Sequence, residues 1–291
     1  MKTSVKTNSI KALALVPGLP HLLTTDPRQL AASHAALAKS MRDLGEDFRR
    51  RGIERIVYYS TQWIAVLGQM FQARANLTGK HVDENWYELG NLPFAFRVDT
   101  GLAGRCVEAA RGMGVQAQLV DYDSFPVDTA TIVADRLLNP KGTMQSGMVA
   151  CNVYTDFAHT TKLAQGLAPA IAADGVPTAI VGVSGLSMRY FTTTIDPRED
   201  RLRDPADDEW NRRMLSRLEQ GDYAAFERDI PAWSGACKVD MGMKAYAFLK
   251  GFAGPGASDA GFAQGKGART LAYGAIWGTG AAVIELPRLN Q

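Results

Sequence analysis

The segment VPTAIVGVSGLSM, residues 176–188, decides how the sequence folds. Its first part, Val176 to Val183, is a short and largely apolar run, which is typical of a strand buried on both faces of a sheet. Its second part turns through serine and glycine and ends at Met188. In α/β proteins, ligands bind beyond the carboxyl ends of the central strands. The segment therefore predicts a buried strand followed by a loop where chemistry usually sits.

Strand-like and helical patterns alternate along the rest of the chain. No internal repeat or linker divides the 291 residues. The sequence therefore predicts one α/β domain over residues 1–291, with a central mixed sheet flanked by helices. Further strands are expected at 11–16, 53–59, 94–98, 116–120, 147–154, 269–276 and 280–286. Helices are expected at 26–51, 101–113, 128–138, 155–173, 209–220, 223–230 and 241–252. The segments 60–63, 196–208 and 254–267 are expected as loops, the second of them charged and solvated.

Composition and charge argue against several classes of partner. The formal net charge is +2, and 21% of the residues are charged, so nothing indicates nucleic acid or an anionic membrane as a partner. No run approaches the roughly 18 to 20 apolar residues of a membrane span. The cysteines Cys106, Cys151 and Cys237 are odd in number and form no Cys-x-x-Cys pair. They predict free thiols and a cytoplasmic location.

Motifs for nucleotide binding and serine hydrolysis are incomplete. No Gly-x-Gly-x-x-Gly follows a strand, and no Walker phosphate loop is present. The segment Gly182-Val183-Ser184-Gly185-Leu186 lacks the second glycine of a nucleophile elbow. No histidine follows His159, so the base that such a serine needs is missing downstream. A serine hydrolase is therefore not the favoured interpretation.

Four positions at the ends of strands are expected to meet. His21 follows the first strand, and Gln62 follows the second. Thr129 begins the helix at 128–138, and Met188 follows the strand at 176–183. Because the carboxyl ends of parallel strands lie at one edge of a sheet, these four loops could converge on a single pocket.

The order of these loops resembles the class III extradiol dioxygenases, the superfamily of protocatechuate 4,5-dioxygenase. The resemblance runs from Pro20-His21 to about Phe252. Members of that family hold Fe(II) with two histidines and a glutamate, which leaves positions open for a diol and O₂. A further histidine acts there as acid–base catalyst. The resemblance implies the same fold for this chain and a pocket at the predicted edge.

The family histidines are mostly replaced. His21 matches the first metal histidine. Gln62, in Ser-Thr-Gln-Trp, stands at the histidine of the family's Ser-Pro-His-Trp pattern. Thr129, in Asp-Thr-Ala, stands at the histidine of Asp-His-Gly, and Met188 stands at the acid–base histidine of Ser-Gly-Gly-Leu-Ser-His. The resemblance thus implies that three of the four histidines are lost.

The carboxylate ligand of the family aligns with Gly242, and Asp240 lies two residues away as the other candidate. A glutamine amide is a weak ligand for Fe(II), a thioether cannot transfer protons, and glycine offers no ligand. The resemblance therefore implies a vestigial pocket at His21, Gln62, Thr129, Met188 and Gly242. It also implies that this chain holds no metal or other cofactor and has no catalytic residue.

The loss of these groups on a retained scaffold favours a structural subunit. We expect the non-catalytic α subunit of a two-component class III dioxygenase, in an α2β2 heterotetramer. A homologous β subunit would hold Fe(II) and open an aminophenol or catechol ring with O₂. One alternative is a stand-alone aromatic-binding protein on the degenerate scaffold. Another is an active enzyme with a metal site built from His21, Asp240 and a second histidine. His81 is expected to be a solvated loop residue.

Overall fold

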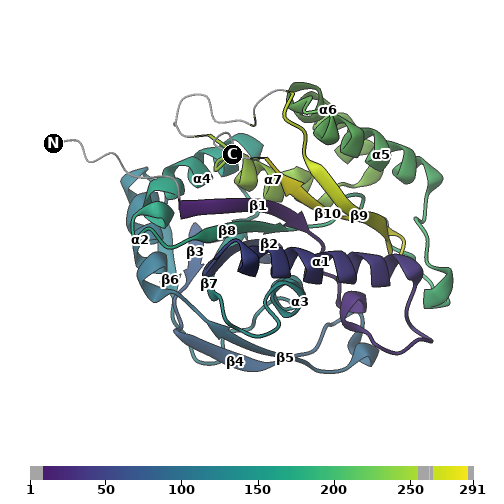
Figure 1. The fold of residues 1–291 in the computed structure, drawn as a ribbon, viewed down its shortest axis with the longest axis horizontal. Coiled ribbons are helices and arrows are strands. Elements are labelled where there is room, and N and C mark those ends of the chain that lie inside the picture. The colour runs from purple at the N-terminus through teal and green to yellow at the C-terminus, as the bar shows by residue number, and fades with distance from the viewer. Residues whose placement is uncertain (1–8, 255–261, 263–264, 288–291) are drawn as a thin grey trace.

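The structure is a computed structural model, and it describes residues 9–254, 262 and 265–287. Its main feature is one sheet of eight strands in the order β6-β3-β7-β2-β8-β1-β10-β9 (Figure 1). The strands are β1 (Ile10–Val16), β2 (Arg55–Ala65), β3 (Gln69–Gln72), β6 (Ala117–Val120), β7 (Gln145–Asn152), β8 (Thr178–Val183), β9 (Arg269–Ile276) and β10 (Thr279–Leu286). The predicted loop at 254–267 lies mostly outside the described residues.

The predicted buried strand, β8, lies in the middle of the sheet. It pairs in parallel with β1 on one side and with β2 on the other, so that Gly182 lies opposite both Leu15 and Tyr59. All six of its residues are buried. Beyond β1, the strands β10 and β9 are antiparallel. The prediction of a mixed sheet flanked by helices is confirmed.

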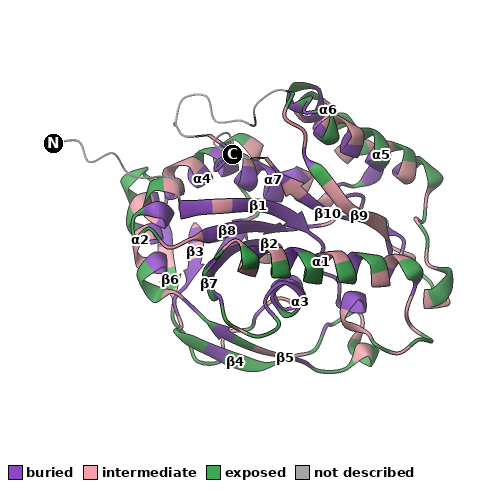
Figure 2. Cartoon of the chain, in the orientation of Figure 1, coloured by how far each residue is buried: buried purple, intermediate pink, exposed green. Residues whose placement is uncertain are grey.

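Successive side chains of a strand point to opposite faces of the sheet, so the apolar central strands have two faces to bury. Helices cover both of these faces. Ile180 packs in the core under the larger helical layer, while Ala179 and Val181 pack in the core on the other face. Figures 1 and 2 show the buried sheet between these layers. The larger layer contains α2 (Thr100–Gly112), α4 (Phe157–Ala172), α5 (Pro205–Glu219), α6 (Tyr223–Cys237) and α7 (Lys244–Lys250). The other layer contains α1 (Ala32–Arg50) and α3 (Thr129–Leu138).

A separate two-stranded sheet covers the outer side of α3. It consists of β4 (Asn76–His81) and β5 (Leu92–Arg97), joined through the short helix η3 (Tyr87–Leu89). Leu77 and Phe96 from this sheet share a hydrophobic cluster with Ile132 of α3. Nine of the ten residues of α3 are therefore buried, and the last residue of β4 lies beside the start of that helix.

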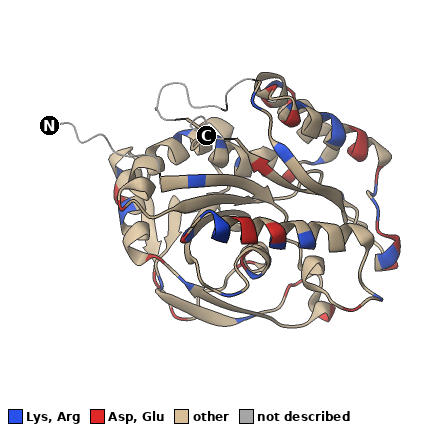
Figure 3. Cartoon of the chain, viewed as in Figure 1, with Lys and Arg blue, Asp and Glu red and all other residues tan. Residues whose placement is uncertain are grey.

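The outer side of α1 is charged, and Figure 3 shows Lys and Arg interspersed with Asp and Glu along it. Lys39 and Asp43 form an exposed ion pair of 2.6 Å one turn apart. No helix among the described residues is long and apolar enough to cross a membrane.

Several predicted boundaries are wrong, and the helix predicted to end at 230 continues to Cys237. The first helix begins at Ala32 and not at Asp26, because the Asp26 carboxylate bonds to Arg28 in a turn. β2 continues through the predicted loop at 60–63 as far as Ala65, with a bulge between Ser60 and Ile64. The predicted helix at 241–252 begins only at Lys244.

The charged segment 196–208 is also less solvated than predicted. The Asp200 and Asp207 side chains are fully buried. Asp200 accepts hydrogen bonds from His34 Nε2, at 2.7 Å, and from the backbone N–H groups of Trp277 and Gly278 in the turn between β9 and β10. The segment therefore fastens this turn to α1, because a buried carboxylate is stable only when its oxygens are bonded.

Arg55 at the start of β2 joins four elements through one buried guanidinium. Its five N–H donors all have partners: Thr178 of β8, Asp99 at 2.6 Å, both oxygens of Asp174, and the Ile171 carbonyl at the end of α4. Asp99 is also the N-cap of α2. Burial disfavours the charge, but the bonds to the two carboxylates outweigh it and raise the pKa of Arg55. One side chain thus fixes how α2 and α4 meet the sheet.

We predict that Arg55→Met lowers the free energy of unfolding by about 3–5 kcal/mol, because it strips two carboxylates of their buried partner. Arg105→Met is the control, since Arg105 also bonds to Asp174 but is 32% exposed, and it should cost about 1 kcal/mol or less. Urea denaturation followed by circular dichroism measures both. Equal losses for the two variants would contradict the role assigned to Arg55.

Candidate functional site

A cavity of about 1020 Å³ opens at the carboxyl edge of the central strands. Its walls come from separate parts of the chain: the end of β2, the link from β4 to η3, the start of α3, the loop after β8, and the turn between β9 and β10. Gln62, Thr129 and Met188, three of the predicted pocket residues, line it together with Asp240. His21 and Gly242 are not among the described residues that line it.

The loop after β8 is held by backbone bonds to two neighbouring segments. The Leu186 N–H donates to the Gly280 carbonyl at 2.8 Å, and the Met188 N–H donates to the Cys237 carbonyl at 3.2 Å. A side chain at Gly185 would place its Cβ 2.5 Å from the sulfur of Met188. Glycine at 185 thus leaves room for the Met188 thioether to lie against the loop.

Asp240 is the carboxylate at the base of this loop. One of its oxygens, Oδ2, accepts three hydrogen bonds, from Thr61 Oγ1 at 2.7 Å, Ser184 Oγ at 2.8 Å and the Gly185 N–H at 3.0 Å. Burial raises the pKa of Asp240, although these three bonds favour its charged form. The carboxylate thus ties β2, the loop after β8 and the segment before α7 together beside the cavity.

Three consecutive residues after Asp240 are left-handed. Met241, Gly242 and Met243 have φ angles of 43°, 58° and 62°, a backbone conformation that residues other than glycine rarely adopt. This turn breaks the predicted helix at 241–252. Met241 lines the cavity, whereas Gly242 lies next to open space.

Gln62 and Thr129 are already occupied by internal bonds. Gln62 Oε1 accepts from the Ala130 N–H at 3.0 Å, so the amide satisfies a free donor at the start of α3. The Thr129 hydroxyl donates to Asp83 Oδ2 at 2.7 Å and accepts from His81 Nε2 at 2.8 Å. Both side chains hold the helix start in place with neutral groups.

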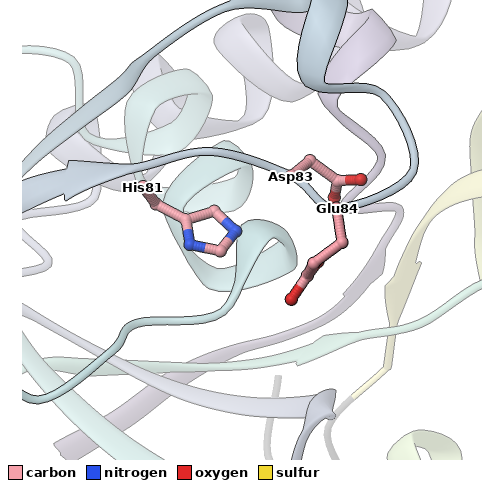
Figure 4. A group of neighbouring side chains, drawn as sticks. All are labelled: His81, Asp83 and Glu84. Carbon is pink, nitrogen blue, oxygen red and sulfur yellow. The ribbon is translucent and has the colours of Figure 1, made fainter.

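His81 at the end of β4 forms a small cluster with Asp83 and Glu84 of the link that follows (Figure 4). Asp83 Oδ1 also accepts from the backbone N–H groups of Asn85 and Trp86, so both oxygens of this buried carboxylate are bonded. Because Thr129 donates to Asp83, His81 Nε2 carries a proton and is not free to bind a metal. His81 is half-buried and bonded, so the prediction of a solvated loop residue is wrong.

His21 lies behind the cavity in an aromatic cluster. Its ring stacks on Trp277 at 5.2 Å between centroids and meets the edge of Trp86 at 5.0 Å, with His34 at 5.6 Å. The side chain is buried, and its Nδ1 has no hydrogen-bond partner among the described residues. Burial, and next the nearby His34, lower the pKa of His21 to about 4.

The donors present do not fit a ferrous site of two histidines and one carboxylate. Gln62 offers an amide oxygen that already accepts from a backbone N–H. Met188 offers a thioether, which prefers softer metals than Fe(II). Asp240 has one oxygen fully engaged with three donors, and His21 lies outside the cavity lining. These side chains can bind and orient a molecule, but they do not make up the family set of two histidines and one carboxylate.

Several wall residues could not be chosen from the sequence. Trp86, Tyr190 and Trp277 line the cavity, and the Trp86 and Tyr190 rings are 5.6 Å apart. They lie far apart in the chain and carry no shared motif. The pair His81 and Asp83 could have been found from the sequence, because residues two apart near the end of a strand point to the same face.

We predict that the free energy of unfolding falls as the pH is lowered from about 6.5 to about 4. Over that range the unfolded chain binds a proton at His21 and the folded chain does not. This difference lowers the free energy of unfolding by about 3 kcal/mol. His21→Phe keeps a ring between the two tryptophans and should remove this part of the pH dependence. His159→Gln, at an exposed histidine, is the control. Urea titrations at a series of pH values measure the effect, and an unchanged slope in His21→Phe would contradict it.

Comparison with known proteins was made by sequence and by structure. No family model matches the chain. It is 39% identical over 281 residues to the 2-aminophenol 1,6-dioxygenase alpha subunit of Pseudomonas sp, covering 95% of this chain and 98% of that protein. It is 22% identical over 241 residues to the beta subunit of the same name, covering 79% and 76%.

The fold is also found in a solved structure. The crystal structure of the uncharacterized protein JW3007 from Escherichia coli K12 superimposes with a TM-score of 0.63, covering 95% of this chain and 100% of that one, at 13% identity. This likeness concerns the fold alone. The identity to the alpha subunit extends over almost the whole chain and matches the class III extradiol dioxygenase framework of the sequence motifs. The chain therefore belongs to the family of the 2-aminophenol 1,6-dioxygenase alpha subunit, within the class III extradiol dioxygenase-like proteins.

Proposed function

We propose that this chain, folded as one domain over residues 1–291, is the non-catalytic α subunit of a heteromeric extradiol dioxygenase of the 2-aminophenol 1,6-dioxygenase kind. Its partner is a homologous β subunit that carries Fe(II) and opens an aminophenol or catechol ring with O₂, in an α2β2 assembly. The names of two relatives support this, since one is an alpha subunit and the other a beta subunit of a single enzyme.

One observation carries the proposal. At the edge of the sheet where a class III enzyme would need metal ligands and a proton carrier, this chain has Gln62, Thr129 and Met188. Gln62 and Thr129 serve to hold α3, and Met188 closes the loop after β8. His21, Gln62, Thr129, Met188 and Gly242 are thus proposed as the remnant of an iron site.

The cysteines bear on the cell compartment. Cys106, Cys151 and Cys237 are all free and buried. We propose a cytoplasmic location, where reduced cysteines persist without disulfide partners.

The first test is expression with and without a partner. The purified chain is expected to contain far less than one iron per chain and to open no ring of 2-aminophenol or catechol. Co-expression with a dioxygenase β subunit is expected to give a stable mixed complex with iron and activity. Metal analysis, size-exclusion chromatography with light scattering, and oxygen uptake measure these outcomes.

The opposite results separate the alternatives. One iron per chain together with ring opening by the chain alone would contradict the proposal and favour a metal site that includes His21 and Asp240. A chain that forms no mixed complex, yet binds aromatic molecules, would favour the stand-alone aromatic-binding protein.

A second prediction concerns Met188 in the complex. Met188→Leu conserves volume and packing, so we expect kcat and iron content of the complex to stay within about twofold of the unmodified complex. Replacing the acid–base histidine of the β subunit by leucine is the matched control and should abolish turnover. Steady-state oxygen uptake measures both, and a loss of turnover above tenfold in Met188→Leu would place the reaction in this chain.

A further inference from the structure

The cavity is acidic. Five carboxylates are among the described residues that line it, and no lysine or arginine is among them. None of the five forms an ion pair with a lysine or arginine in the described part of the chain. They are Asp83, Glu84, Glu88, Asp128 and Asp240. Among its described lining residues the cavity therefore combines several carboxylates with His81 and with no lysine or arginine.

The three deeper carboxylates are held by neutral donors. Asp128 accepts from Ser60 Oγ at 2.7 Å and from the Thr131 N–H at 2.9 Å, and it caps α3. Asp83 and Asp240 accept only from hydroxyl and backbone N–H groups. Such donors favour the ionised form of a carboxylate but do not neutralise it. The Oδ1 atom of Asp240 accepts no hydrogen bond from the described residues, so it remains available to a ligand.

Aromatic side chains form another part of the wall. Trp86, Tyr190 and Trp277 line the cavity, and His21 packs between the two tryptophans. Burial raises the pKa of Tyr190, and the charges of Asp240 and Asp83 raise it further. A phenol in this wall is thus exposed to a negative potential. Aromatic rings next to carboxylates are the usual surroundings of bound organic cations.

We propose that this cavity binds a small organic cation, namely an aromatic molecule that carries an ammonium group. The ring would pack on the aromatic wall, and the ammonium would donate to the unsatisfied oxygen of Asp240. A metal ion at His81, Asp83 and Glu84 is the competing occupant, although Thr129 already engages His81 Nε2 and Asp83 Oδ2. The whole cavity belongs to this chain, so the inference goes beyond the proposed subunit role and does not depend on a partner.

The test uses three probes of nearly equal size on the full chain. Benzylammonium is positively charged at neutral pH, benzyl alcohol is neutral and benzoate is negative. We expect benzylammonium to bind with one site per chain and about tenfold or more tighter than benzyl alcohol, and benzoate not to bind measurably. Isothermal titration calorimetry gives stoichiometry and affinity, and quenching of tryptophan fluorescence reports contact with Trp86 or Trp277.

Variants locate the site. Asp240→Asn keeps an oxygen for Thr61 and Ser184 but removes the charge, and it should reduce the preference for benzylammonium over benzyl alcohol about tenfold. Glu84→Gln combined with Glu88→Gln, at exposed positions, should weaken benzylammonium without risk to the fold. Asp43→Asn on α1 is the matched control and should change nothing.

Three results would overturn the inference. The first is equal affinity for benzylammonium and benzyl alcohol, and the second is no binding of either probe. The third is binding of one Zn²⁺ or Mn²⁺ per chain that displaces benzylammonium, which would make the acidic cluster a metal site. A folded Asp240→Asn chain that keeps the full preference would also contradict the placement, as would loss of binding in Asp43→Asn. A failure of subunit assembly would leave all these measurements possible on the chain alone.

Discussion

The guanidinium of Arg55 is the interaction on which the arrangement of the larger helical layer depends. A buried cation is costly unless every donor is bonded, and here five donors meet oxygens from β8, α2, α4 and the turn after α4. These elements can therefore approach the sheet in only one way. At the opposite end of the strands, that fixed arrangement leaves β2 and β8 ending side by side, with Asp240 bonded to both.

Asp240 and Arg55 play related parts at the two ends of the same strands. Each buried charge collects donors or acceptors from several segments, but Asp240 lies beside a cavity while Arg55 is sealed in protein. On the proposal that this edge is the remnant of an iron site, its side chains now serve as structural supports. Gln62 holds the start of α3, Thr129 links His81 to Asp83, and Met188 covers the loop.

Much of the fold could be predicted from local sequence. The run at 176–183 is largely apolar because β8 is buried on both faces. Asp128 was recognisable from its residue type as a helix cap, and its side chain does bond to the third residue of α3. The errors arise where distant contacts override local preference. Ser60 to Trp63 resemble a loop, but pairing with β7 extends the strand through a bulge, and nothing local announces three left-handed residues before α7.

The site was harder to predict for the same reason. The replaced histidines were visible in motifs, so Gln62, Thr129 and Met188 could be named as pocket residues. The aromatic wall could not, because Trp86, Tyr190 and Trp277 meet only in three dimensions. Asp200 is similar. In the charged segment 196–208 it has no mark that separates it from its neighbours, and yet its side chain is fully buried against His34.

The bond between Asp200 and the turn before β10 also bears on the order of folding. Asp200 lies 77 positions before Trp277 of this turn and 166 positions after His34, which it also contacts, and β10 pairs with β1 from the other end of the chain. Contacts of such long sequence separation pay a large loop-closure entropy and form slowly. During synthesis the wall around Trp277 cannot assemble until the last strand has left the ribosome. The cavity can therefore close only after β8 and its neighbours β1 and β2 have been synthesised, because all three strands precede Trp277 in the chain.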